Sequence, residues 1–338
     1  MGSHRRLVQT SGFNRGAGAA LSVLSAAAAA LGAVPAVAAP SDDTRAEVDR
    51  LYEEVEHATE AYNKADERAD SLREEVGTAQ DGIARQQERI NSMREALGSL
   101  AGAQYRSGGL DPSLALLFSD DPDEYLDKAA VLDRISAHQA GELKDLQEAM
   151  RELAQERSEA AQKLGELEKS RKAVASHKRT VERKLASARE LLNSLPSDER
   201  AAYDRASRSG RSGMPDLSGA VAPSGRAAAA VSAAQSAIGM PYVWGANGPT
   251  GFDCSGLTQW AYAQAGVALP RTSQAQRYAG RQVPLSQAMP GDLVTYRGDA
   301  SHVGMYVGNG QVVHAPYPGA PVRYDPVGMM PGATVTRP

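Results

Sequence analysis

The first 200 residues contain apolar positions that recur every seven residues. Residues 45–106 carry two such rows on one face of a predicted helix, with charged residues on either side. This pattern is typical of a long α-helix that buries a narrow stripe against a partner helix in a coiled coil. The first row is Val48, Val55, Tyr62, Ala69, Val76, Ile83, Ile90 and Leu97. The second row is Leu51, Ala58, Ala65, Leu72, Ala79, Gln86, Met93 and Leu100.

A second pair of rows begins near Leu132 and becomes regular between residues 143 and 195. Its first row is Leu143, Met150, Arg157, Leu164, Arg171, Lys178, Leu185 and Leu192. Its second row is Leu146, Leu153, Ala160, Leu167, Val174, Val181, Ala188 and Leu195. The three basic residues in the first row weaken apolar packing but help to fix the register of the two helices.

The segment between the two patterns predicts a reversal of the chain. Two glycines and a proline within residues 107–112 end the first helix, and Asp-Pro-Asp-Glu at 121–124 begins the next. We therefore expect residues 39–195 to form an antiparallel coiled-coil hairpin, with arms on the order of 90–110 Å long. An apolar cluster at residues 114–118 falls at its tip. That cluster either folds back on the arms or docks a partner.

The pattern changes twice more towards the C-terminus. Residues 196–225 are rich in Ser, Gly, Pro and Arg without periodicity, which predicts a flexible linker. From residue 226 onward, short apolar strand-like runs alternate with Gly and Pro turns and two short helical patterns, at 226–238 and from 255 to 265. Residues 226–338 therefore predict a compact α+β domain.

The N-terminal 38 residues have the features of a secretory signal peptide. Three arginines precede the small, apolar stretch 16–34, and Ala36-Val37-Ala38 matches a cleavage site. The alternative is an uncleaved membrane anchor, but the run is short and rich in alanine. Arg5-Arg6 leaves export by the general or the twin-arginine route open. We expect a secreted, cell-wall-associated protein that begins near residue 39.

Charge differs between the two halves of the mature chain. Residues 39–225 carry a net charge of −10, whereas residues 226–338 carry +3, with seven Arg, four Asp and neither Lys nor Glu. A cationic domain is attracted to an anionic wall polymer, although a net charge of +3 produces only a modest electrostatic field. No nucleic-acid partner is expected, and no His or Cys spacing indicates a metal site.

Cys254 is the single cysteine of the chain. A lone cysteine in a secreted protein indicates a reactive thiol or an intermolecular disulfide, while the more ordinary reading is a small buried apolar residue. The helical spacing that begins at Ser255 places Cys254 in the first turn of a helix, where the helix dipole favours the thiolate. On this reading iodoacetamide labels the native thiol readily.

Only two of the six histidines, His302 and His314, lie beyond residue 200. Both fall in strand-like sequence on either side of Gly308-Asn309-Gly310, so a hairpin brings them together. A two-residue Asn-Gly turn would put the two rings on opposite faces of the sheet. A three-residue loop with a bulged Gly310 would place Gly304 opposite His314 and both rings on one face. A catalytic pair requires the second arrangement.

Residues 226–326 resemble the NlpC-type cysteine peptidases, papain-like enzymes that cut bacterial peptidoglycan. Six stretches in order carry the resemblance: Pro241-Tyr242-Val243-Trp244-Gly245, Phe252-Asp253-Cys254-Ser255-Gly256-Leu257, Leu269-Pro270-Arg271-Thr272-Ser273, Pro290-Gly291-Asp292-Leu293-Val294, His302-Val303-Gly304-Met305-Tyr306-Val307-Gly308 and Val313-His314-Ala315-Pro316. Ala246 departs from the family, which often has a second glycine there, and its methyl group narrows the expected groove.

The resemblance implies a role for each matching residue. Cys254 would be the nucleophile, with its own backbone N–H as an oxyanion donor, His302 the general base, and His314 the third residue that orients the base. Four further residues would line the substrate groove: Tyr242, Asp253, Ser255 and Arg271. Two of these also have structural readings, because Asp253 can cap the helix and Arg271 can brace a loop. No cofactor and no metal are implied.

The family resemblance leads to a functional hypothesis with two alternatives. We expect hydrolysis of a stem peptide in peptidoglycan, at the bond between D-γ-glutamate and the diamino acid that this family usually cuts. The alternatives are an amidase on the same scaffold and a non-catalytic wall-binding activator. The helical arms are similar to coiled coils that dock on membrane division complexes of the FtsEX type. Because the hairpin is long and acidic, we expect it to restrain the catalytic domain.

Overall fold

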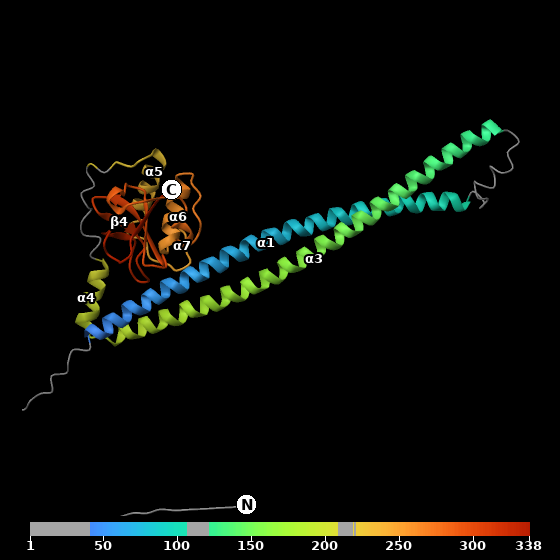
Figure 1. The fold of residues 1–338 in the computed structure, drawn as a ribbon. Helices are drawn as coiled ribbons and strands as arrows, with labels where there is room; N and C mark the ends of the chain where they lie inside the picture. The colour runs from blue at the N-terminus through green and yellow to red at the C-terminus, as the bar shows by residue number, and fades with distance from the viewer. Residues whose placement is uncertain (1–40, 107–121, 209–218, 220) are drawn as a thin grey trace, which may run out of the picture. The chain divides into compact units, whose positions relative to one another are not determined.

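The computed structural model describes residues 41–106, 122–208, 219 and 221–338 (Figure 1). The signal peptide (1–38) and the apolar cluster at 114–118 lie outside the described residues. The helices are α1 (Ser41–Arg106), α3 (Pro122–Ser194), α4 (Ser197–Arg208), α5 (Gly225–Ser236), α6 (Cys254–Gln264), α7 (Ser273–Gln276) and the 3₁₀ helix η2 (Leu285–Gln287). The strands are β1 (Arg281–Val283), β2 (Leu293–Tyr296), β3 (His302–Gly308), β4 (Gln311–His314), β5 (Arg323–Pro326) and β6 (Thr334–Arg337).

Helices α1 and α3 form the predicted antiparallel hairpin and lie side by side in Figure 1. Three apolar clusters join them, and their members run in opposite directions along the two helices. The clusters are Val48, Tyr52, Val55 and Ala58 with Val181, Leu185 and Ala188; Ala69, Leu72 and Val76 with Leu167; and Ile90 with Ala149 and Leu153. The heptad pattern therefore predicted both the partner and the direction of pairing.

The first row of α3 lies in the core at Leu185 but not at three of its earlier apolar positions, where the pattern predicted burial. Leu143, Met150 and Leu164 are about half exposed, at 50%, 44% and 46%. Most of the second row is buried instead, including Leu153, Ala160, Leu167, Val181 and Ala188. The basic residues within the first row explain this rotation, because a cation is expensive to bury without a partner. Arg157 instead donates a hydrogen bond to Gln87 near the solvent.

The predicted linker at 196–225 contains a helix, α4, so it is not irregular throughout. Asp198 and Glu199 lie in the first turn of α4, where the helix dipole favours negative charge. Tyr203 packs against the aromatic ring of Tyr317 and donates a hydrogen bond to Asp49 of α1. The sequence lacked an apolar stripe here because one tyrosine makes most of the contact.

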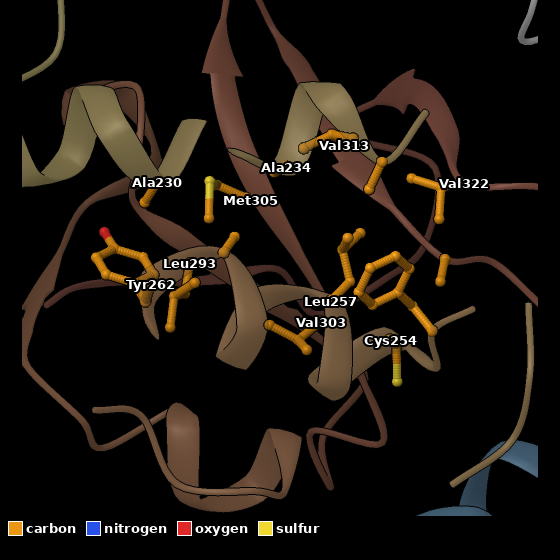
Figure 2. Packing of buried hydrophobic residues seen from close by; sticks show 14 of the residues in the cluster. Ala230, Ala234, Cys254, Leu257, Tyr262, Leu293, Val303, Met305, Val313 and Val322 are labelled. Carbon is orange, nitrogen blue, oxygen red and sulfur yellow. The ribbon is translucent and has the colours of Figure 1, made fainter. Parts of the chain in front are cut away.

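Residues 221–338 fold into the predicted α+β domain around an antiparallel six-stranded sheet, in the order β1-β6-β2-β3-β4-β5. Helices α5 and α6 pack against each other and against β3. Figure 2 shows the apolar cluster between helices and sheet, with Cys254 at its rim. The cluster includes Ala230, Ala234, Leu257, Tyr262, Leu293, Val303, Met305, Val313 and Val322. Within the described ranges, no helix combines the length and the hydropathy needed to cross a membrane.

Candidate active site

Cys254 is the first residue of α6, as the helical spacing predicted. Asp253 is the N-cap, and its Oδ1 accepts a 2.7 Å hydrogen bond from the backbone N–H of Gly256. Gly256 allows α6 to start this close to the preceding loop, because a Cβ there would lie 2.2 Å from the carbonyl oxygen of Ala246. The cap and this close approach together fix the direction in which the thiol points.

His302 and His314 lie on the same face of the sheet and are joined by a hydrogen bond. Nε2 of His302 lies 2.8 Å from Nδ1 of His314, and the two rings are perpendicular. Both side chains are almost completely buried. The Nδ1 atom of His302 has no hydrogen-bond partner within the described chain. That nitrogen faces Glu56 of α1, whose Oε1 lies 3.5 Å away.

The turn that brings the histidines together differs from the predicted three-residue loop. Gly308 pairs with Gln311, so Asn309 and Gly310 form a two-residue turn, and both have positive φ angles, of 50° and 70°. These angles are typical of a type I′ turn. The bulge lies within β3 at Val307 instead of at the predicted Gly310, because the register shifts between Tyr306 and Gly308 and leaves Val307 unpaired.

The bulge restores the alignment that a catalytic pair requires. Met305 pairs with Val313, which places Gly304 opposite His314, as predicted. A Cβ on Gly304 would lie 3.1 Å from Cβ of His314, so the glycine leaves room for the imidazole. The predicted loop length was wrong, whereas the predicted alignment of Gly304 with His314 is confirmed.

The predicted groove residues Asp253, Arg271 and Ser255 form one hydrogen-bonded cluster beside the thiol. Arg271 binds both carboxylate oxygens of Asp253, at 3.0 and 2.6 Å, and donates to Ser255 Oγ at 3.0 Å. Asp253 therefore caps the helix and binds Arg271, and the roles of all three residues in a substrate groove stay predictions. The buried Tyr242 hydroxyl has no hydrogen-bond partner within the described chain, and burial, with the charge of Cys254 next, raises the pKa of its phenol.

Four side chains of α1 that the sequence analysis did not single out are buried at this site. They are Glu56, Thr59, Glu60 and Asn63. Glu60 Oε1 lies 3.7 Å from the Cys254 thiol and accepts a 2.8 Å hydrogen bond from Ser255 Oγ. Glu60 Oε2 accepts another from the backbone N–H of Ser273, also at 2.8 Å. The helix thus places a carboxylate directly against the nucleophile.

Glu56 makes a second set of contacts one turn earlier along α1. Its Oε2 accepts a 2.6 Å hydrogen bond from Arg297, and its Oε1 lies 3.5 Å from Nδ1 of His302. Burial opposes ionisation of Glu56, but the charges and hydrogen bonds of His302 and Arg297 outweigh it and lower its pKa. His57 and Asp299 form a further, more exposed ion pair at 2.8 Å. Helix α1 is therefore bound to both catalytic candidates.

The thiol itself is in an environment that favours its neutral form. Burial, followed by the charges of Glu60, Asp253 and Glu56, raises the pKa of Cys254 well above its ordinary value. These effects override the helix dipole on which the sequence prediction relied. The Cys254 side chain is 1% exposed, so the expected ready labelling by iodoacetamide does not apply to this arrangement of the chain.

Comparison with known proteins now adds to this geometry. Residues 239–331 match the NlpC/P60 family. The C-terminal domain is an NlpC/P60 cysteine peptidase domain. This match covers all six stretches that carried the resemblance.

Two curated relatives of the NlpC/P60 domain are named as probable endopeptidases. The Mycobacterium tuberculosis protein Rv2190c is 52% identical over 99 residues, which are 29% of this chain and 26% of that protein. A Corynebacterium glutamicum protein is 48% identical over 109 residues, which are 32% of this chain and 52% of that protein. The chain therefore spans about a quarter and about half of the length of these relatives.

A solved structure is also similar to the NlpC/P60 domain. The NlpC/p60 domain of the peptidoglycan hydrolase SagA is 39% identical, with a TM-score of 0.31, and covers 33% of this chain and 98% of that domain. The family match covers residues 239–331, so the residues of α1 that fill the site lie outside it.

Proposed function

We propose that the chain is a secreted peptidoglycan hydrolase, a cysteine endopeptidase that cuts the stem peptide between D-γ-glutamate and the diamino acid. The single observation that carries the proposal is the His302–His314 hydrogen bond within an NlpC/P60 domain whose cysteine, Cys254, begins a helix. The names of the relatives support hydrolysis of wall peptides. The signal-like residues 1–38 and the cationic C-terminal domain support action at the cell wall.

The proposed reaction proceeds by acyl transfer through a thioester. Nδ1 of His302 takes the proton of the Cys254 thiol, and the sulfur attacks the carbonyl carbon of the scissile bond. The backbone N–H of Cys254 stabilises the oxyanion. The imidazolium returns the proton to the leaving amine as the C–N bond breaks. Water, deprotonated by His302, then hydrolyses the thioester and regenerates the thiol.

The contacts of α1 support a further part of the proposal, namely that the hairpin restrains the enzyme. Glu60 lies against the thiol, and Glu56 lies against the base, so a peptide substrate has no access to either while α1 is in place. The raised pKa of Cys254 adds an electrostatic barrier to this steric one. Activation then requires that α1 leave the site. A membrane complex of the FtsEX type that binds the hairpin is the proposed activating partner.

The decisive experiment is digestion of purified wall by the mature chain and by its C-terminal domain, with mass spectrometry of the products. The domain should begin at residue 221, because Ser224 caps α5 by accepting from the N–H of Ala227. New N-terminal diamino acid identifies the proposed endopeptidase. Release of an intact stem that begins with L-alanine identifies the amidase instead. Absence of any cleavage, together with stimulation of another hydrolase, identifies a non-catalytic activator.

A further inference from the structure

Asp325, on strand β5, makes a contact that extends the Cys254–His302–His314 arrangement by one residue. Its Oδ2 lies 2.7 Å from Nε2 of His314, whose Nδ1 lies 2.8 Å from Nε2 of His302. The same Oδ2 accepts a 2.7 Å hydrogen bond from Nε of Arg323. Three consecutive strands, β3, β4 and β5, thus supply one continuous chain of hydrogen bonds that ends at a carboxylate.

The protons along this chain follow from the chemistry of its groups. An ionised carboxylate accepts hydrogen bonds and donates none, so Nε2 of His314 must carry a hydrogen. Burial, offset in part by the hydrogen bond to Asp325, lowers the pKa of His314 to about 4, so the ring is neutral near pH 7. A neutral imidazole has a single N–H, and Nδ1 of His314 is therefore an acceptor. Nε2 of His302 must then be the donor, so whenever His302 is neutral its Nδ1 is the nitrogen without a hydrogen.

We propose that Asp325 is a positioning residue that fixes the tautomers of both histidines and so presents Nδ1 of His302 as the base. This inference rests on the proposed cysteine-peptidase function and deepens it. Asp325 touches neither the thiol nor a substrate, and it acts through His314.

A histidine that orients the catalytic base, as His314 does, needs an acceptor such as Asp325 for a physical reason. An imidazole between two partners fits equally well with its proton on either nitrogen. If the proton of His314 lay on Nδ1, Nε2 of His302 would have to accept, and His302 would carry its proton on Nδ1. That tautomer cannot take a proton from the Cys254 thiol. An acceptor at Nε2 of His314 removes this choice.

Arg323 keeps Asp325 suited to this role. Burial opposes ionisation of Asp325, but the hydrogen bonds and charges of His314 and Arg323 outweigh it and lower its pKa. The guanidinium carbon of Arg323 also lies 5.6 Å from the ring centre of Tyr317, so the cation is held on two sides. The carboxylate is therefore ionised and oriented over the pH range in which a peptidase of this kind works.

The first test replaces Asp325 and measures catalysis on purified wall by the mature chain and by residues 221–338. We expect kcat to fall on the order of 10-fold for Asp325→Asn and on the order of 100-fold for Asp325→Ala, with KM unchanged. The matched control is Asp292→Asn, because Asp292 is also paired with an arginine, Arg337, at 2.7 Å, and within the described chain it forms no hydrogen bond or ion pair with a histidine. Equal kcat values for all four proteins would overturn the proposal.

The second test reads the tautomers directly by NMR of the mature chain labelled with ¹⁵N-histidine. We expect His314 to carry its hydrogen on Nε2 in the parent and to become a mixture of tautomers in Asp325→Ala. A hydrogen on Nδ1 of His314 in the parent contradicts the proposal whatever the activity is. The Asp292→Asn control should leave the His314 signals in place.

A third test separates positioning from a merely structural role. In a His314→Glu background the third group is itself an acceptor, so it needs no help from Asp325 and is repelled by it. Asp325→Asn should therefore raise kcat in that background by several-fold, although it lowers kcat beside His314. Loss of kcat in both backgrounds would assign Asp325 to folding alone.

Failure of the proposed function has a different signature from failure of this inference. If the parent domain cleaves no wall peptide, the proposed endopeptidase function is contradicted, but the NMR test of the tautomers can still be made. If the parent cleaves wall peptide, but substitution of Asp325 changes neither the histidine tautomers nor kcat, only the positioning role is contradicted.

Discussion

Two parts of helix α1 meet different surroundings. We call residues 52–63, which contact the peptidase domain, the proximal turns, and the residues from 83 onward the distal turns. From Ile83 onward the buried positions all belong to the stripe that faces α3, and the charged residues are exposed or half-exposed. Between Tyr52 and Asn63 the helix is buried on a second face as well, and that face carries Glu56, Thr59 and Glu60. The heptad pattern predicts the contact with α3 in both regions. It does not predict the contact of the proximal turns with the peptidase domain, because that contact is polar.

The difference shows how a charged helix surface becomes an inhibitor without apolar residues. Glu56 and Glu60 are four residues apart, so they lie on one side of the helix. Glu56 meets Arg297 and His302, whereas Glu60 meets two hydrogen-bond donors and the thiol. Burial raises the pKa of both carboxylates, but His302 and Arg297 outweigh it for Glu56, whose pKa is lowered, whereas the pKa of Glu60 is raised to about 7. Glu56 therefore favours docking, and an ionised Glu60 opposes it.

The largest expected effect tests whether the proximal turns cover a working nucleophile. Cys254→Ser should lower wall cleavage by at least about 1,000-fold in the mature chain and in residues 221–338, because an alkoxide is far harder to form than a thiolate. Product analysis by mass spectrometry measures the rate. Undiminished lysis by the serine variant would contradict the cysteine mechanism. The contact of the proximal turns with Cys254 would then have no inhibitory role.

The next effect comes from removal of the whole hairpin. Residues 221–338 should cleave wall at least about 10-fold faster than the mature chain at equal molarity, a ratio that corresponds to about 1.4 kcal/mol of docking free energy. Iodoacetamide should label Cys254 faster in the shorter protein by a similar factor, because the thiol loses its cover. Equal rates in both assays would mean that the hairpin is only a tether.

A single substitution in the proximal turns should reproduce part of that release. Glu56→Ala leaves Arg297 without its buried partner while α1 is docked, so the closed arrangement should weaken by roughly 1–2 kcal/mol. The labelling rate of Cys254 in the mature chain should rise by about 5-fold to 30-fold. The matched control is Glu88→Ala on the distal, exposed part of the same helix, which should leave the rate unchanged. A release by both substitutions would indicate general loosening of the hairpin.

The smallest expected effect is a pH dependence of the restraint. The pKa of Glu60 is about 7 when α1 is docked, raised by burial and then by Asp253, against 4.5 for the ordinary group. The docked form thus binds an extra proton between these values, so its stability is full below pH 4.5 and falls as pH rises towards 7. The rate of the mature chain relative to residues 221–338 should increase several-fold across this window.

Glu60→Gln is the variant that checks this assignment. Two ionisable neighbours of Glu60 shift away from this window, because the pKa of Glu56 is lowered and that of Cys254 is raised. The ratio of rates should therefore become independent of pH between 4.5 and 7 in the variant. A slope that persists would assign the pH dependence to another group.

The sequence predicted the fold well because the fold follows from repeating patterns. Heptads specified the hairpin, and short apolar runs with Gly and Pro turns specified the sheet domain. The pattern failed for the first row of α3, where it marked Leu143 and Leu164 as core although neighbouring cations keep that edge near solvent. It also missed α4, because one tyrosine anchors that helix rather than a stripe.

The candidate site was predictable where its residues carry local signals. Cys254 lies at the start of a helix and His302 lies in a strand. In both cases the local sequence pattern predicted the position of a residue whose side chain is chemically reactive. Glu56, Glu60 and Asp325 carry no local signal, since each becomes important only through a residue that is distant in the chain or on another strand. Glutamates on a charged helix resemble any solvated face, and an aspartate in a short strand resembles an edge residue. Only the tertiary contacts distinguish them.

The unpaired Val307 has a consequence for how this hairpin tolerates changes in length. Faces alternate along a strand, and in a hairpin with a two-residue turn His302 and His314 share a face only when an even number of paired residues separates them, so the unpaired Val307 takes up the odd residue of the segment. Deletion of Val307 itself would therefore leave a regular hairpin with both rings on one face, whereas insertion of one further paired residue in either strand would turn one ring to the opposite face. Single-residue changes of length are therefore expected to be tolerated at the bulge and not elsewhere in the two strands.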